Sequence, residues 1–153
     1  MTALRIELGP STATFRRGED RHDVPIGAQS LAASIAGDPP DPADLSNAIG
    51  LVLDHLDDVS RALPGAAAGG IEFAGASALV VAAVEVGGAP ALPFRLDRHA
   101  AEEVFRTLAT EARADRARNP GLPAEWVHDV LGACCWLVGV MRHFDLDDAA
   151  VVG

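Results

Sequence analysis

The stretch from Arg5 to Phe15, RIELGPSTATF, contains residue types that could grip a phosphate group. Two short strand-like runs flank a turn made of glycine, proline, serine and threonine, and Glu7 lies near the end of the first run. Glycine lets a ligand approach the backbone closely, so that several N–H groups can point at its oxygens. Pro10 departs from this pattern because proline has no backbone N–H to offer.

Other residues that could do chemistry give weaker patterns. Cys134 and Cys135 are adjacent in an apolar run, and neighbours on a helix point about 100° apart, so we expect two buried thiols and no disulfide. The segment Asp145–Asp148 lacks the glycine and the terminal glutamate of a calcium loop and is interpreted as a solvated turn. The histidines have no metal-ligand spacing relative to the cysteines; they are His22, His55, His99, His128 and His143.

Two further polar groups are interpreted as structural. His128 and Asp129 could form half of a catalytic base pair, but no serine or cysteine nucleophile is placed beside them in the sequence. Arg113, Arg116 and Arg118 could bind an anion, but their spacing is more typical of a solvated helix end.

The strands that would position the hairpin are short. Leu4–Leu8, Ala13–Arg17 and Asp23–Ile26 predict an antiparallel meander, with turns at 9–11 and 18–20. Ile71–Ala74 predicts a buried strand after two glycines, and Ala149–Val152 predicts a final strand.

Four helices are predicted between and after these strands. Asp41 is a good N-cap with Pro42 in the first helical position, and apolar residues keep helical spacing up to Pro64. Ala76–Val86 predicts a helix of small residues, and Asp97 caps the next helix. The last helix, predicted from Pro123 to about His143, is apolar on nearly all sides from residue 130, which is typical of a helix between layers. The resulting order is βββ-α-β-α-α-α-β.

Composition restricts the classes of function. A chain of 153 residues fits one domain, taken here as residues 1–153. Its net charge of −10 repels polyanions, so we expect no nucleic-acid partner. The N-terminus lacks a basic start followed by an apolar stretch, and the longest apolar run, residues 130–141, is shorter than the roughly 20 residues of a spanning helix. We therefore expect a cytoplasmic protein with no membrane partner.

The order of elements and three segments together resemble the second half of the core of the exopolyphosphatase and guanosine pentaphosphate phosphohydrolase (Ppx/GppA) family, in the actin-like superfamily. RIELGPSTATF resembles the family loop D-I-G-G-G-S-T-E-[FL], and DVPIGAQSLAA, residues 23–33, is similar to the strand and segment that follow it. RNPGLP, residues 118–123, with Asp129 and the apolar helix, is similar to the family segment P-G-L-x-x-x-R-A-D-x-I-x-x-G. The resemblance implies a single α/β domain of the ribonuclease-H-like (actin-like) fold, with a mixed five-stranded sheet flanked by helices.

The resemblance also implies two phosphate loops, the second of them at residues 74–77. The corresponding ligand-binding positions here are Gly9, Ser11, Thr12, Gly75 and Ser77, with Glu7 as a weak counterpart of the metal-side aspartate. Several departures remove polar groups: Pro10 lacks an N–H, Ala13 and Thr14 replace a threonine and a glutamate, and Ala76 replaces the threonine of the second loop. Trp126 stands where the family has an arginine. One lost donor costs about 3–4 kcal/mol of transition-state stabilisation, so we expect vestigial loops.

Three functions are compatible with this interpretation. The preferred one is a non-catalytic assembly or regulatory domain that needs no cofactor. The second is a subunit of a split phosphoanhydride hydrolase acting on polyphosphate or guanosine pentaphosphate with Mg²⁺, in which another chain supplies the first half. The third is a sensor that binds a phosphate ligand without chemistry. We expect a homodimer or a partner chain carrying the missing half.

Overall fold

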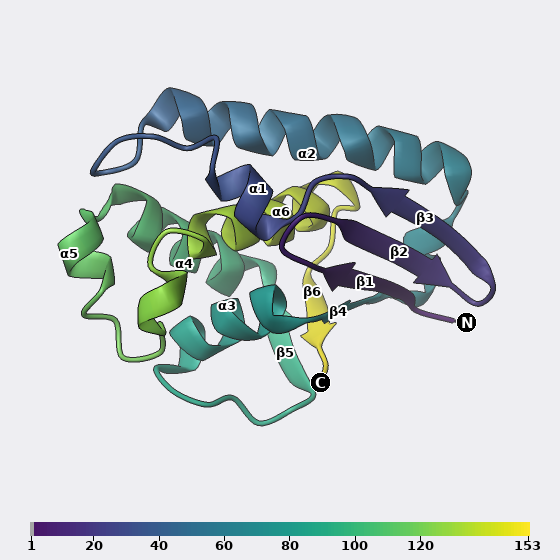
Figure 1. Cartoon of the computed structure of the whole chain (residues 1–153). Helices are drawn as coiled ribbons and strands as arrows, with labels where there is room; N and C mark the ends of the chain where they lie inside the picture. Colours follow the sequence, from purple (N-terminus) through teal and green to yellow (C-terminus); the bar gives the residue numbers. More distant parts are fainter. Residues whose placement is uncertain (1) are drawn as a thin grey trace.

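The computed structural model describes residues 2–153 and shows a mixed six-stranded sheet in the order β3-β2-β1-β4-β6-β5 (Figure 1). The antiparallel meander consists of β1 (Leu4–Leu8), β2 (Ala13–Arg17) and β3 (Asp20–Val24). β4 (Ile71–Ala74) pairs in parallel with β1, and β6 (Asp148–Val151) pairs in parallel with β4. β5 (Phe94–Asp97) lies antiparallel to β6 at the edge of the sheet.

Six α-helices connect these strands. They are α1 (Ala28–Ala32), α2 (Pro42–Ala62), α3 (Ala76–Val86), α4 (Arg98–Thr110), α5 (Arg113–Arg116) and α6 (Val130–His143). Two short 3₁₀ turns, Ala66–Gly69 and Ala124–Trp126, precede β4 and α6.

The helix α6 lies at the centre of the molecule. Its residues from Val130 to Met141 are all buried, and α1, α2, α3 and α4 all pack against it (Figure 1). The ring of Trp136 packs on Phe15 of β2 with ring centroids 6.1 Å apart. The inward side chains of β1, Leu4, Ile6 and Leu8, belong to the same hydrophobic core. The apolar run of α6 is therefore explained by packing between the sheet and the outer helices.

Helix caps fall where the sequence predicts them. The Asp41 side chain accepts a hydrogen bond from the Ala43 N–H at 2.8 Å, and Pro42 is the first residue of α2. The Asp97 side chain accepts from the Ala100 N–H at 2.7 Å. Each cap satisfies a donor that the first helical turn leaves free.

The α/β fold class is confirmed, but the predicted strand count is wrong. The sheet has six strands and not five, because Phe94–Asp97 forms an edge strand in which only Leu96 is buried. A single buried position gives no alternating pattern for sequence reasoning to detect. The order also gains the short helices α1 and α5. In addition, α6 begins at Val130 and not at Pro123, and β3 begins at Asp20, three residues earlier than predicted.

The interpretation of Arg116 as part of a solvated helix end is wrong. Its side chain is buried and donates hydrogen bonds to the carbonyl oxygens of Val127, at 2.9 Å, and Glu111, at 2.7 Å. Burial lowers the pKa of this guanidinium. Arg116 therefore joins the end of α4 to the segment that leads into α6.

Cys134 and Cys135 are free, buried thiols on α6, as expected. Burial raises the pKa of Cys135 to about 12 and raises that of Cys134 as well. The sequence contains neither lysine nor tyrosine, so these two thiols dominate side-chain titration in the alkaline range.

We predict that the free energy of unfolding falls as the pH rises from 9 toward 12. In that window the unfolded chain loses thiol protons that the folded chain keeps, which favours unfolding by up to about 1.4 kcal/mol per pH unit for each thiol. Urea titrations at several pH values measure this slope. The variant with both Cys134→Ala and Cys135→Ala should lose most of it, and equal slopes in the two proteins would contradict the prediction.

Candidate ligand pocket

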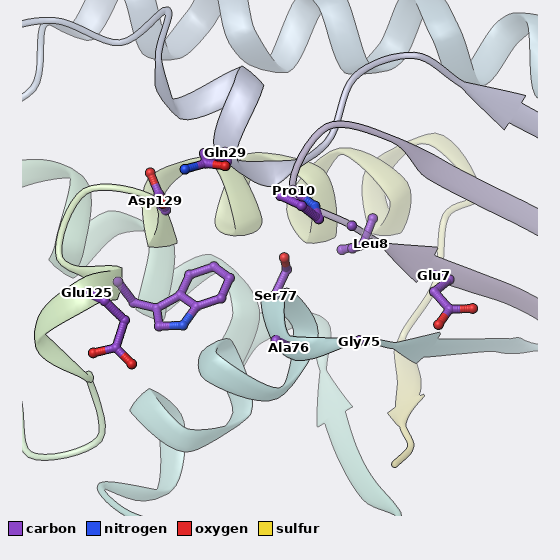
Figure 2. A pocket seen from close by; sticks show the side chains of 11 residues that line it. Glu7, Leu8, Pro10, Gln29, Gly75, Ala76, Ser77, Glu125 and Asp129 are labelled. Carbon is purple, nitrogen blue, oxygen red and sulfur yellow. The ribbon is translucent and has the colours of Figure 1, made fainter.

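A pocket of about 530 Å³ opens where β1 and β4 end, between the β1–β2 turn and the start of α3 (Figure 2). The loop before α6 closes its other side. The residues that line it are Glu7, Leu8, Gly9, Pro10, Gln29, Gly75, Ala76, Ser77, Glu125, Trp126 and Asp129. Segments that are far apart in the sequence therefore meet at one site.

The first loop uses its backbone groups within the protein. The Gly9 N–H donates to the Thr12 carbonyl oxygen at 2.9 Å, and Pro10 has no N–H. The Gly9 carbonyl accepts from the Ala28 N–H at 3.0 Å, and the Pro10 carbonyl accepts from two further N–H groups at the start of α1, each at 3.0 Å. A Cβ on Gly27 would lie 2.3 Å from the Gly9 oxygen, so only glycine fits at that position. The turn is thus fixed against α1.

The second loop forms the floor of the pocket at the N-terminus of α3. Gly75 has a φ of 97°, and a Cβ there would lie 2.9 Å from the Leu8 carbonyl oxygen, so packing against β1 requires glycine. No side chain caps α3, and its first turn has no acidic residue. Ser77 is 2% exposed, and its hydroxyl points into the pocket, on the side of Pro10 (Figure 2). Its side chain forms no hydrogen bond with the described residues.

The charged groups of the pocket are all acidic. Glu7, Glu125 and Asp129 contribute carboxylates, none of which forms an ion pair within residues 2–153, and no basic side chain lines the pocket there. Carboxylates at a rim repel a phosphate anion unless a cation lies between them. The electrostatics of the pocket therefore disfavour a bare phosphate group.

The carboxylates do not form a metal site. Within residues 2–153, no three histidine, cysteine, aspartate or glutamate side chains are grouped closely enough to hold a metal ion. Figure 2 shows Glu7 on the β1 side of the pocket, with Glu125 and Asp129 on the opposite side. The residues present thus do not fit the magnesium ion that the split-hydrolase alternative implies.

The structure brings together only part of the predicted site. Glu7, Gly9, Gly75 and Ser77 line the pocket, whereas Ser11 and Thr12 are exposed in the turn and do not line it. Sequence reasoning missed Gln29 and Glu125, for which the sequence carries no motif. It noted Asp129 as a base-pair candidate and as part of the segment that resembles the family, and Trp126 as a departure from the family pattern.

The fold resembles about half of several solved exopolyphosphatase-type structures. A solved structure of an exopolyphosphatase-like protein superimposes on 99% of this chain with a TM-score of 0.89 and 17% sequence identity. The Ppx/GppA phosphatase of Aquifex aeolicus has a TM-score of 0.85 at 16% identity. An exopolyphosphatase from Cytophaga hutchinsonii has a TM-score of 0.76 at 17% identity.

This chain spans about half the length of these solved structures, covering 54%, 53% and 53% of them respectively. The likeness to half of an exopolyphosphatase-type chain is therefore confirmed at the level of the fold, and the order of the sequence motifs assigns it to the second half. No family model matches the sequence, and no curated protein matches it.

We predict that Pro10→Gly destabilises the protein without changing its fold. Proline restricts the unfolded chain, so its replacement by glycine costs about 0.4–1 kcal/mol and lowers the melting temperature by a few degrees. Differential scanning calorimetry measures this shift. An unchanged or higher melting temperature would show that Pro10 does not stiffen the turn.

Proposed function

We propose that this chain is a non-catalytic assembly or regulatory domain built on the fold of a phosphatase half. The observation that carries the proposal is how the backbone groups of the first loop are hydrogen-bonded. The Gly9 N–H is bonded within the turn, Pro10 has no N–H, and the carbonyls of both residues are held by α1. Neither Gly9 nor Pro10 therefore offers a backbone donor to a phosphate oxygen.

The charge of the pocket supports the same proposal. Its three carboxylates are unpaired, and Trp126 occupies the wall where the resemblance implies an arginine. Catalysis of phosphoryl transfer depends on positive groups that stabilise the negative charge of the transition state. The lining residues offer no such group, so the proposal expects no cofactor and no turnover.

A second candidate is a subunit of a split phosphoanhydride hydrolase, which is favoured by one observation. The uncapped N-terminus of α3 and the Ser77 hydroxyl both face the pocket, as a phosphate site requires. This function also needs Mg²⁺ and another chain that supplies the missing half. A phosphate sensor would use the same groups without chemistry.

We predict that the purified chain releases no phosphate from polyphosphate or guanosine pentaphosphate with Mg²⁺ present, because the first loop lacks donors and the pocket lacks cations. A colorimetric phosphate assay measures release. Magnesium-dependent release that is lost in Glu7→Ala and retained in Glu19→Ala would overturn the non-catalytic role. Glu19 is a suitable control because it is exposed in the β2–β3 turn.

An apolar groove beside the pocket supports the assembly role. It has a volume of about 400 Å³, and its lining includes Leu79, Val80, Pro120, Pro123 and Trp126. Leu79 is 38% exposed there. Exposed apolar surfaces of this kind are often covered by a partner, and a symmetric dimer is the commonest assembly. We propose that a second copy of the chain covers the groove, with a chain carrying the other half as the alternative.

We predict that the protein is a dimer at micromolar concentration and that Leu79→Glu shifts it to monomer, because the change places a charge in the groove. Analytical ultracentrifugation measures the mass. Leu51→Glu is the matched control, since Leu51 is 40% exposed on α2, away from the groove. A monomeric unmodified protein, or equal effects of the two variants, would count against this interface.

A further inference from the structure

The outer edge of the meander carries backbone groups that are free to pair. β3 is the last strand on its side of the sheet, and its only strand neighbour is β2 (Figure 1). The two-residue turn between them makes Arg17 and Asp20 a hydrogen-bonded pair, and pairs alternate along antiparallel strands. The N–H and carbonyl groups of Arg21 and Asp23 therefore point away from the sheet. No backbone partner for them is found among residues 2–153.

The side chains of these two residues carry opposite charges on one face of β3. The Arg21 guanidinium bonds the Asp23 carboxylate at 3.0 and 3.1 Å, and the two side chains are 52% and 51% exposed. Edge strands are usually protected from pairing by charges of a single sign or by proline, which oppose an added strand. An edge that alternates a cation and an anion is instead complementary to a second copy of itself.

Only one register of such a second copy suits the charges. Free backbone groups must lie opposite free groups, so Arg21 and Asp23 can face only one another or themselves near the centre of the strand. Arg21 opposite Arg21, or Asp23 opposite Asp23, places like charges directly across the strands. The second of these also sets Arg21 against Pro25, which has no N–H. Arg21 opposite Asp23 gives two pairs of opposite charge.

We infer that β3 pairs antiparallel with β3 of a second copy of the chain, around a two-fold axis at His22. Arg21 of each copy lies opposite Asp23 of the other, and their backbone groups exchange hydrogen bonds. The two His22 residues face each other as a non-hydrogen-bonded pair. Such an interface is isologous, because the same strand serves both copies. The sheets of the two copies become continuous across it.

This surface is distinct from the apolar groove, which is lined by residues of α3 and of the segment before α6. The inference goes beyond the proposed function because it requires neither the pocket nor the groove. Exposed ion pairs contribute little and the strand is short, so we expect a dissociation constant on the order of 0.1–1 mM. At micromolar concentration the edge is therefore unpaired, and the test of the groove is unaffected.

Disulfide trapping tests the register directly. Opposite Cα atoms of a non-hydrogen-bonded pair are about 4.5 Å apart, within the range that a disulfide spans, so His22→Cys should cross-link to itself under mild oxidation. Asp20→Cys is the matched control, because this exposed residue of the same strand lies more than about 13 Å from its counterpart in the inferred register. We expect His22→Cys to form cross-linked dimer at least about fivefold faster than Asp20→Cys. The unmodified chain should form none, since its two cysteines are buried.

Charge exchange tests the complementarity, with the His22→Cys cross-link as the readout. Adding Arg21→Asp makes both facing pairs acidic, and adding Asp23→Arg makes both basic, so each change should slow cross-linking at least about fivefold. An equimolar mixture of these two proteins restores opposite charges across the interface and should recover at least about half of the original rate. Both proteins lack the ion pair within the strand, so a merely structural role of that pair would not produce the recovery. Thiol reactivity toward Ellman's reagent corrects for differences between the variants.

Equal cross-linking of His22→Cys and Asp20→Cys would overturn the inference, because random collisions favour the more exposed thiol. A mixture that cross-links no faster than its separate components would also overturn it. If His22→Cys does not fold, sedimentation at submillimolar concentration compares Arg21→Asp, Asp23→Arg and their mixture without the cysteine, and only the mixture should associate as the unmodified chain does. These results are independent of Leu79→Glu, so the edge and the groove can fail separately.

Discussion

The hydrogen bonds between the β1–β2 turn and the first turn of α1 are the constraint on which the rest of the structure depends. The carbonyls of Gly9 and Pro10 accept N–H groups from α1, and Gly27 lies so close that no side chain fits between them. α1 in turn packs on α6, the buried helix that contacts most of the other helices. The turn is therefore part of the scaffold and not a mobile ligand loop.

This constraint explains why the two loops differ in how many of their backbone groups are already hydrogen-bonded. In the first loop the carbonyls of Gly9 and Pro10 accept hydrogen bonds from α1, and the Gly9 N–H donates to the Thr12 carbonyl within the turn. The second loop keeps the open N-terminus of α3, because no side chain caps that helix. The charged side chains around the pocket are acidic, so these donors lie near carboxylates that repel an anion.

Much of the fold follows from local patterns in the sequence. β1, β2, β4 and α3 have the predicted bounds, because alternating burial in the strands and the glycines that flank β4 and α3 define them. The edge strand β5 has only one buried position, and α1 has only five residues, so neither gives a periodic pattern that sequence reasoning could detect. The prediction for Arg116 was wrong because its side chain folds back on the carbonyls of Leu108 and Glu111 at the end of α4 and on that of Val127, and no sequence pattern indicates these contacts.

The candidate site could be predicted only in outline. The motifs located Gly9, Gly75 and Ser77, and the structure places all three at one pocket. That Ser11 and Thr12 lie outside it depends on how the turn is held by α1, which no local pattern encodes. The grouping of Glu125 and Asp129 opposite Glu7 depends on the path of the chain between α5 and α6. The net charge of the pocket therefore follows from how the fold brings these side chains together, and the loop motifs alone do not predict it.

The central claim is that the first loop no longer serves a phosphate ligand. Isothermal titration calorimetry of the unmodified protein with pyrophosphate, with and without Mg²⁺, tests it most directly. The account predicts no heat beyond dilution in either condition, because the Gly9 N–H is engaged within the turn, Pro10 has no N–H and the charged groups of the pocket are acidic. Micromolar binding of pyrophosphate would contradict it and would favour the sensor or the split hydrolase.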